Sequence, residues 1–188
     1  MATNDLDFQS LKQTLWEDSD GKIVMFEVSA EHYVTHSIRV IQALAAVGEG
    51  IVVALSRPHK SMLRSLRKND VNVENMWFVD AVSPSVGIPV QEGERVMFVE
   101  SVDPNLLMNV ITQFFLCISS EKRYIYLDSL ATLAVYRGGD ALIKFFRQIT
   151  AKSRMLGYLG VVLAVEKELD EGLRAQIAML CDDVISLT

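Results

Sequence analysis

The feature that most constrains the fold is a regular alternation between short apolar runs and longer segments with helical periodicity. Apolar runs of strand length cover residues 23–28, 51–55, 76–79, 96–99, 124–127, 161–165 and 184–187. Between them, apolar residues recur every three or four positions, as they do along one face of a helix. Parallel strands need crossover connections, which place helices against the sheet. The pattern therefore predicts an α/β fold of three layers, a mainly parallel twisted sheet with helices on both faces.

The helices are predicted from apolar spacing and from their start and stop signals. They fall near residues 8–16, 34–45, 58–68, 103–118, 140–149 and 169–180. Asp103 followed by Pro104 is a strong start, and we expect the next helix to be capped near Asp140. Gly138 and Gly139 predict a break before it. Residues 81–95 hold two prolines and two glycines without periodicity, and are predicted to be the one long loop.

Composition excludes several classes of protein. Half of the residues are hydrophobic and 22% are charged, so the chain is not predicted to be disordered. The net charge of −6 argues against nucleic-acid binding, and the one basic stretch, Arg57 to Lys68, is interpreted as the solvated face of a helix. No apolar run reaches the length of a membrane span and we recognise no signal peptide, so we expect a cytoplasmic protein. Cys117 and Cys181 lie in apolar helical patterns and are predicted to be buried, reduced thiols.

The domain organisation is predicted to be simple. No linker, repeat or change of composition divides the chain, so we expect one domain over residues 1–188. Residues 1–20 are predicted to form a short helical extension at its N-terminus.

Candidate functional residues follow the strands, because ligands of open parallel sheets bind beyond the carboxyl ends of the strands. These positions are 27–36, 56–59, Asp80, Asp128 with Ser129, and Glu166. The sharpest is the apolar strand that ends in Asp128 and Ser129, a carboxylate followed by a hydroxyl. Asp128 could act as a base or bind Mg²⁺, but we favour a structural hydrogen bond at the edge of the sheet.

The segment Tyr124-Ile-Tyr-Leu-Asp128-Ser129 resembles the Walker B segment of the RecA/KaiC superfamily of P-loop ATPases. The order of strands and helices from Lys22 onward, the segment Ile41-Gln-Ala-Leu44, Val165-Glu166 and the closing residues 181–187 extend the resemblance. Residues 55–60 and 77–80 are most similar to a divergent KaiC-like subgroup, of a branch common in archaea, without functioning phosphate loops. The resemblance implies a RecA-like P-loop NTPase fold.

The resemblance places the phosphate loop between the first strand and the first helix that follows it. There the motif GxxxxGK[ST] uses glycines to aim backbone N–H groups at phosphates, and a lysine to neutralise them. Aligned without gaps on the segment 41–44, the eight positions are Ala30, Glu31, His32, Tyr33, Val34, Thr35, His36 and Ser37. Ala30 and Thr35 replace the two motif glycines, Tyr33 a third frequent glycine, and His36 the lysine. Only Ser37, at the Mg²⁺-binding position, is kept.

The loss of these groups predicts that phosphate chemistry is absent or vestigial. Non-glycine residues seldom adopt the positive φ of such a loop, and Glu31 adds a negative charge. Ser56-Arg57 occupy the position of the family's catalytic glutamate. Positioning and charge stabilisation supply nearly all of phosphoryl-transfer catalysis, so we predict no catalytic residue and no cofactor. The predicted vestigial nucleotide site consists of Ala30, Glu31, Tyr33, Thr35, His36, Ser37, Asp128, Ser129 and Glu166.

Two histidines have the spacing of metal ligands. His32 and His36 are four residues apart near a helix start, as two metal ligands can be, and Glu31, His59 or Asp128 could converge on them. We interpret the histidines as ordinary polar residues and predict no metal.

Three functions remain open at this point. The leading hypothesis is a non-hydrolysing pseudo-ATPase, an interaction or regulatory protein that pairs with itself as a homodimer or with a paralogous RecA-like ATPase. The second is a nucleotide-binding ATPase with an atypical phosphate loop, in which His36, Ser37 and Asp128 act. The third is a nucleic-acid-binding module that uses the basic stretch, against which the net charge argues.

Overall fold

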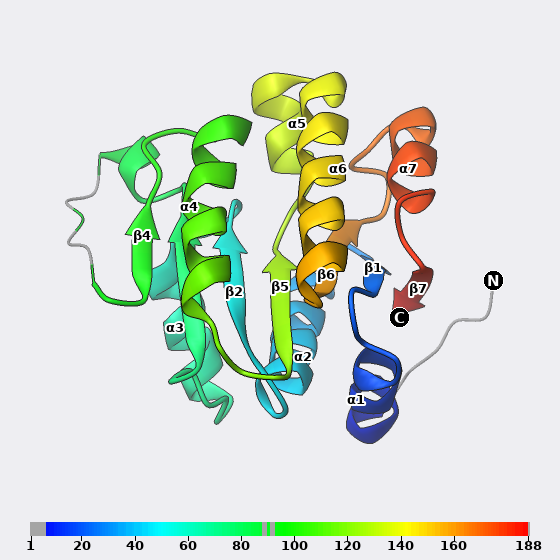
Figure 1. Cartoon of the computed structure of the whole chain (residues 1–188). Helices are drawn as coiled ribbons and strands as arrows, with labels where there is room; N and C mark the ends of the chain where they lie inside the picture. Colours follow the sequence, from blue (N-terminus) through cyan, green and yellow to red (C-terminus); the bar gives the residue numbers. More distant parts are fainter. Residues whose placement is uncertain (1–6, 88–89, 91–92, 188) are drawn as a thin grey trace.

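The computed structural model describes residues 7–87, 90 and 93–187, and its centre is a seven-stranded sheet (Figure 1). The strand order is β4-β3-β2-β5-β6-β1-β7, and every neighbouring pair is parallel. The strands are β1 (Ile23–Val28), β2 (Glu49–Ala54), β3 (Met76–Asp80), β4 (Val96–Phe98), β5 (Arg123–Leu127), β6 (Leu159–Val165) and β7 (Asp183–Leu187). The predicted three-layer α/β class is confirmed.

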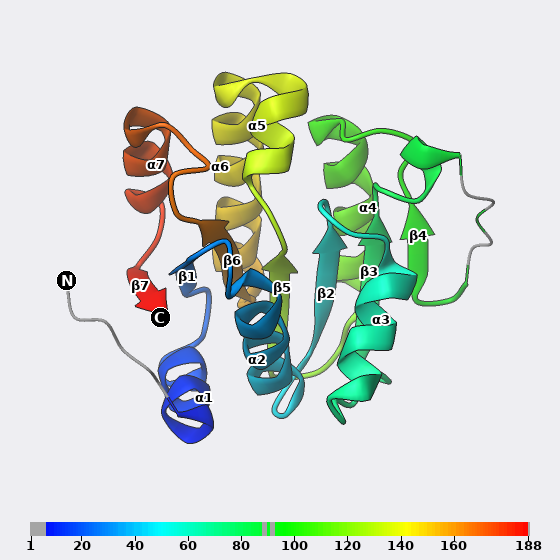
Figure 2. The same cartoon turned by 180° about the vertical axis from the view of Figure 1, so that it is seen from behind.

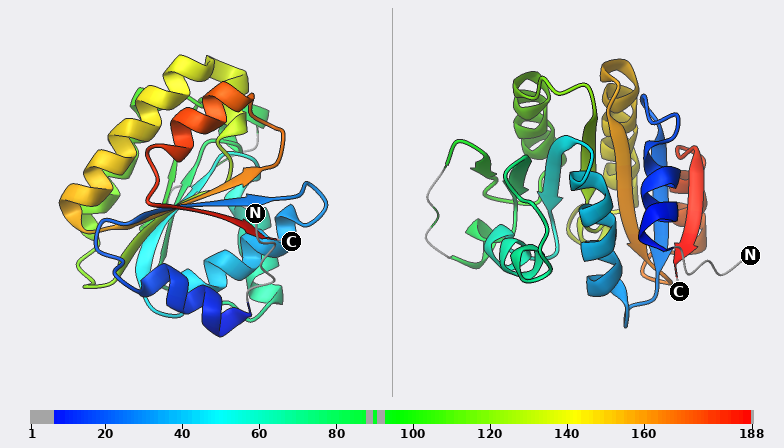
Figure 3. Two further views of the ribbon diagram at one scale, coloured as in Figure 1. Left: turned by 90° about the vertical axis from the view of Figure 1, so that its right-hand side faces the viewer. Right: turned by 90° about the horizontal axis from the view of Figure 1, so that it is seen from below.

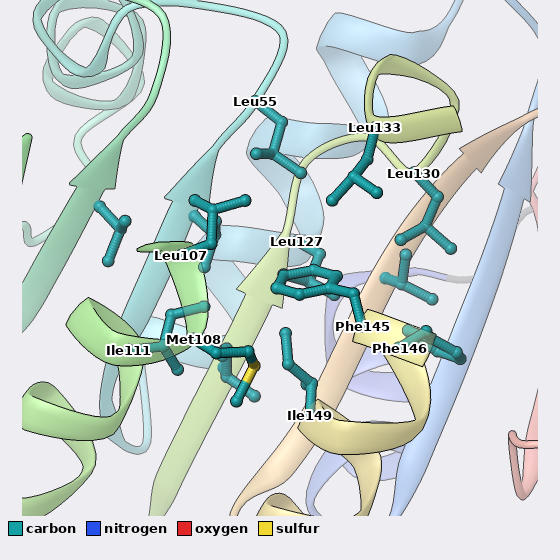
Figure 4. Close-up of a cluster of buried hydrophobic side chains, with 14 of the residues drawn as sticks. Leu55, Leu107, Met108, Ile111, Leu127, Leu130, Leu133, Phe145, Phe146 and Ile149 are labelled. Atoms are coloured by element: carbon teal, nitrogen blue, oxygen red, sulfur yellow. The ribbon is translucent and has the colours of Figure 1, made fainter. Parts of the chain in front are cut away.

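The helices form two layers that bury both faces of the sheet. One layer holds α1 (Phe8–Trp16), α2 (Tyr33–Ala45) and α3 (His59–Lys68) (Figure 2). The other holds α4 (Pro104–Cys117), α5 (Ala131–Arg137), α6 (Gly139–Leu156) and α7 (Glu171–Ala178), and Figure 3 shows the sheet between the two layers. Each layer contributes its own apolar cluster, and Figure 4 shows the one beneath α4 and α6.

The N-terminal helix is part of the core. Leu11 and Leu15 are buried against the α2 side of the sheet, and the indole Nε1 of Trp16 donates a hydrogen bond to the Ala43 carbonyl at 3.0 Å. Within the predicted extension of residues 1–20, residues 1–6 lie outside the described part of the chain.

Local start signals explain which helix boundaries were predicted correctly. The Asp103 carboxylate accepts hydrogen bonds from the N–H groups of Asn105 and Leu106 and caps α4, as expected. The predicted cap at Asp140 is wrong, because α6 begins at Gly139 and no side chain caps it. Helix α5 was not predicted, since only Leu133 of its seven residues is buried and it has no apolar stripe. Gly138, at φ 83°, makes the break between the two helices.

The basic stretch lies on α3 largely as predicted. Met62 and Leu66 are buried, while Lys60, Arg64, Arg67 and Lys68 are exposed. His59 is the exception, because it is buried beside Asp80.

The prediction of two buried thiols is wrong for Cys117. This residue ends α4, where the helix leaves the core, and its side chain is exposed. Cys181 is half-buried, and burial raises the pKa of its thiol to about 12. In the part of the chain that the structure describes, no helix is long and apolar enough to cross a membrane.

The approach of β2 to β5 generates a prediction about stability. A Cβ atom added at Gly50 would lie 2.4 Å from both the ring and the carbonyl oxygen of the buried Tyr124. Gly50→Ala should therefore lower the free energy of unfolding by roughly 1–3 kcal/mol, as overpacked cores do. Urea unfolding measures the change, and Gly93→Ala is the control because its Cβ would meet no atom within 4 Å. Equal stability of the two variants would contradict this packing.

Candidate functional site

Two carboxylates at strand ends hold the connection between β2 and α3 at the carboxyl edge of the sheet. Asp128 follows β5 and Asp80 ends β3, so the topology places them on either side of β2. Both side chains are fully buried. Between them they accept hydrogen bonds from the backbone N–H groups of Leu55, Ser56 and His59. The connection is thus fixed from both sides by charge-assisted hydrogen bonds.

Asp128 makes the structural hydrogen bonds that we favoured for it. Its Oδ1 accepts from the Leu55 N–H at 2.7 Å, and its Oδ2 accepts from the Ser56 N–H at 3.1 Å and the Ser56 hydroxyl at 2.7 Å. Burial raises the pKa of this carboxyl to about 6, although the donors on Ser56 and Leu55 and the charge of Arg57 oppose the rise. Its acceptor positions are therefore directed at the protein's own backbone.

Asp80 caps helix α3 from a distance in sequence. Pro58 stands at the N-cap and supplies no side-chain bond, so the His59 N–H donates instead to Asp80 Oδ2 at 2.9 Å. The same oxygen lies 2.7 Å from His59 Nδ1 and accepts from the Ser83 hydroxyl. Burial raises the pKa of Asp80, but the hydrogen bonds from Ser83 and His59 outweigh it and hold the pKa below its ordinary value.

The turn that corresponds to the phosphate loop differs in its backbone from a phosphate-binding nest. It is a tight turn in which the His32 N–H donates to the Ser29 carbonyl at 3.2 Å, and α2 starts immediately at Tyr33. Thr35, His36 and Ser37 therefore lie inside the helix, and the His36 N–H donates to the His32 carbonyl at 2.9 Å. No residue from 29 to 37 has a positive φ. An anion-binding nest needs alternating backbone conformations that this turn lacks.

Ser37, the one motif residue kept, is buried in a side-chain network. Its hydroxyl lies 2.9 Å from the hydroxyl of Tyr126 on β5, and both side chains are fully buried. The Arg57 guanidinium approaches the Ser37 Oγ at 3.5 Å and lies over the Tyr33 ring at 5.7 Å from its centroid. The Arg57 cation is thus engaged with the protein itself.

The Tyr33 side chain covers Asp128 from the side of α2. Its hydroxyl donates to the Asp128 carbonyl at 2.8 Å and lies 2.9 Å from the Ser56 Oγ. Burial, followed by the charge of Asp128, raises the pKa of this hydroxyl well above its ordinary value, so it remains a proton donor at neutral pH. The side chain fills space that glycine would leave open at this position.

A cavity of about 580 Å³ lies above this network at the carboxyl edge. Residues that follow β1, β2, β3, β5 and β6 contribute to it, together with η1 (Pro84–Val86) and α5. Among the described residues that line the cavity, most are apolar and none is Lys, Arg or His. A site of this composition offers no charge with which to neutralise a phosphate.

The nine predicted site residues separate into three groups. Ala30, Tyr33 and Ser129 line the cavity. Ser37, Asp128 and His36 are buried and do not line it. The remaining three, Glu31, Thr35 and Glu166, are exposed outside it. The negative charge of Glu31 therefore does not face the cavity.

His32 and His36, the two histidines with the spacing of metal ligands, lie beside each other at the start of α2. The rings of His32 and His36 pack edge to face, 6.0 Å apart, while His32 Nδ1 contacts the Ser29 hydroxyl. His59 and Asp128, two of the residues that could have converged on them, are engaged with Asp80 and Ser56. Over the described residues, no group of three or more His, Cys, Asp or Glu side chains could hold a metal ion.

Sequence reasoning missed three residues of this region: Tyr126, Arg57 as a neighbour of Ser37 and Tyr33, and Glu168. Tyr126 carries a signal, since a tyrosine within an otherwise aliphatic strand needs a hydrogen-bond partner when it is buried. Arg57 and Glu168 lie in connections, and nothing in the local sequence shows which way their side chains point.

The raised pKa of Asp128 predicts how stability depends on pH. Because the folded pKa of about 6 lies above the ordinary value of 3.8, the stabilisation from protonating Asp128 is present below about pH 4 and is lost as pH rises through 6. Between pH 4 and pH 7.5 the wild type should lose roughly 2–3 kcal/mol more stability than Asp128→Asn. Urea unfolding of both proteins across this range is the measurement, and parallel stability profiles would refute the assignment.

Comparisons with known proteins agree on the fold. No protein-family model matches the chain, and no curated protein matches it in sequence. The structure is similar to a KaiC-like protein from the archaeon Pyrococcus horikoshii OT3, with a TM-score of 0.61 and 12% identity over 89% of this chain and 71% of that one. It is also similar to the flagellar accessory protein FlaH from Methanocaldococcus jannaschii, with a TM-score of 0.56 and 14% identity over 97% and 78% of the two chains.

A DnaB-like replicative helicase gives a TM-score of 0.57 and 9% identity over 88% of this chain and 46% of its own. At such low identities these likenesses concern the fold alone. With its parallel seven-stranded sheet between two helical layers, the chain has the RecA/KaiC-like P-loop ATPase fold.

Proposed function

We propose that the chain is a non-hydrolysing pseudo-ATPase that acts as an interaction or regulatory protein. One observation carries the proposal: the two side chains in the positions of Mg²⁺ partners make hydrogen bonds to other groups of the protein. Ser37 is bonded to Tyr126, and Asp128 to the backbone of Leu55 and Ser56. Mg²⁺ is bound through carboxylates, substrate phosphates and several retained waters, for which these buried positions leave no room.

Two further features support the same conclusion. The N–H of His36 is used within α2, so it is not aimed at a phosphate. The cavity wall carries no cation among its described residues. An enzyme that transfers phosphoryl groups uses backbone N–H groups and cations to stabilise the charge of its transition state.

Nucleotide titration tests the proposal. Isothermal titration of the chain with ATP and Mg²⁺ should show no binding in the micromolar range, and phosphate release should be the same for the wild type, His36→Ala and Asp128→Asn. Circular dichroism confirms that each variant is folded. Micromolar binding that depends on Mg²⁺ would remove the basis of the proposal. Phosphate release that falls in either variant would favour the second hypothesis, an ATPase with an atypical loop.

The partner proposed for this cytoplasmic protein is a second copy of the chain. Of the aromatic residues Tyr33, Trp77 and Tyr136, only Tyr136 is strongly exposed. The Trp77 indole donates to Glu49 and packs on Phe114, and the Tyr33 hydroxyl is bonded as described above. Strongly exposed apolar side chains also lie at the ends of α4, α6 and α7, where they are Leu116, Met155 and, just after α7, Met179. We therefore place the contact of a two-fold dimer on this helical layer.

A dimer of this kind should form without nucleotide and bury more than about 1,000 Å² in total. Sedimentation equilibrium at tens of micromolar should give the mass of two 21.0 kDa chains, with and without ATP. Met155→Glu should shift the protein toward the monomer, because it places a charge in the contact, whereas Val34→Glu on α2 should not. A wild-type mass of one chain would refute self-association and favour a paralogous RecA-like partner.

A further inference from the structure

The cavity at the carboxyl edge has a lining that is unusual for a site open to solvent. Its walls include Val82, Val86, Val102, Val135 and Val165. Val86 and Val135 are 61% and 82% exposed, so water contacts a large apolar area there. Its volume of about 580 Å³ lies within the range of roughly 300–1,000 Å³ that small-molecule sites occupy. The cavity therefore has the size and the walls of a ligand site.

The polar groups of the cavity are hydroxyls and one carboxylate. The hydroxyls belong to Tyr33, Ser56, Ser85, Ser129, Thr132 and Tyr136. Glu168 is the one charged residue among the described residues of the lining. A hydroxyl can either donate or accept a hydrogen bond, so the hydroxyls do not select the charge of a ligand. The carboxylate does, because it attracts a cation and repels an anion.

Glu168 is placed at the cavity by a tight turn after β6. Its N–H donates to the Val165 carbonyl at 3.3 Å, and Lys167 between them adopts a left-handed conformation with φ 65°. The negative charge of Glu168 also contributes to the raised pKa of Tyr33, so the two side chains lie within electrostatic reach. Arg57, which lies over the Tyr33 ring, does not line the cavity, and neither does Lys167.

We propose that this cavity binds a small organic cation, a molecule with an ammonium group on an apolar body about the size of one aromatic ring. The ammonium group would pair with Glu168, and the exposed ring of Tyr136 would add the attraction that aromatic rings exert on cations. The apolar body would cover the exposed valines. The proposal rests on the proposed function in one respect, that no nucleotide occupies this edge of the sheet.

Three probes of equal size and different charge test the proposal. Benzylamine, benzyl alcohol and benzoate are each added at millimolar concentrations to the ¹⁵N-labelled full chain at pH 7, and amide shifts are followed by NMR. Benzylamine should shift the amides of Ser129, Thr132 and Tyr136 in a saturable way. Its affinity should exceed that of benzyl alcohol by about fivefold, the effect of one ion pair near a surface, and benzoate should bind more weakly still.

Matched variants separate charge from shape. Glu168→Gln should bring the benzylamine and benzyl alcohol affinities together. Ala131→Phe should weaken binding of all three probes by narrowing the cavity, whereas Ala175→Phe on the exposed face of α7 should leave it unchanged. The proposal is overturned if no probe shifts the cavity amides, if benzoate binds as tightly as benzylamine, or if Ala131→Phe binds normally. A separate titration with ATP and Mg²⁺ tests the proposed function, so the two can fail independently.

Discussion

The buried carboxylate of Asp128 is the interaction on which the rest of the candidate site depends. It lies at the end of β5, in the middle of the sheet, and it binds the backbone where β2 ends. Burying a charge is costly unless hydrogen bonds compensate for it, so the Leu55 and Ser56 donors must stay in place. Asp80 likewise accepts a hydrogen bond from the backbone N–H of His59, where α3 begins. The two anchors thus fix the connection between β2 and α3 at this edge of the sheet.

The same anchors account for what this edge of the sheet can and cannot do. In a working phosphate site, polar groups are held ready for a ligand, and their bonds are completed only when it binds. Here the polar groups are already hydrogen-bonded within the protein: the Ser37 hydroxyl pairs with the Tyr126 hydroxyl, and the Asp128 carboxylate accepts from the Ser56 hydroxyl. What remains open is the apolar wall of the cavity, with Glu168 as its charge. The fold is that of an ATPase, but function resides in the site, and most of the described residues that line this cavity are apolar.

Much of the fold was predictable, because it follows from periodicity. All seven strands and six of the seven helices come from apolar spacing that tertiary packing then satisfies. Helix α5 escaped because a short helix at the surface needs no apolar stripe, and Cys117 was misplaced because the last turn of a buried helix can leave the core. At the site, the sequence predicted which residues stand after the strands. It could not predict that Arg57 covers Tyr33 or that Glu168 faces the cavity, since those orientations depend on contacts between distant segments.

The central claim is that Ser37 and Asp128 are closed to a metal–nucleotide complex. Paramagnetic Mn²⁺ in place of Mg²⁺ tests it at the residues themselves, since a bound Mn²⁺–ATP complex broadens the NMR signals of nearby nuclei. If these residues are closed to the complex, the amide signals of Ser37 and Asp128 should keep their line widths in the presence of Mn²⁺–ATP, as should signals from the far end of α2. Selective broadening at Ser37 and Asp128, reversed by excess Mg²⁺–ATP, would contradict it.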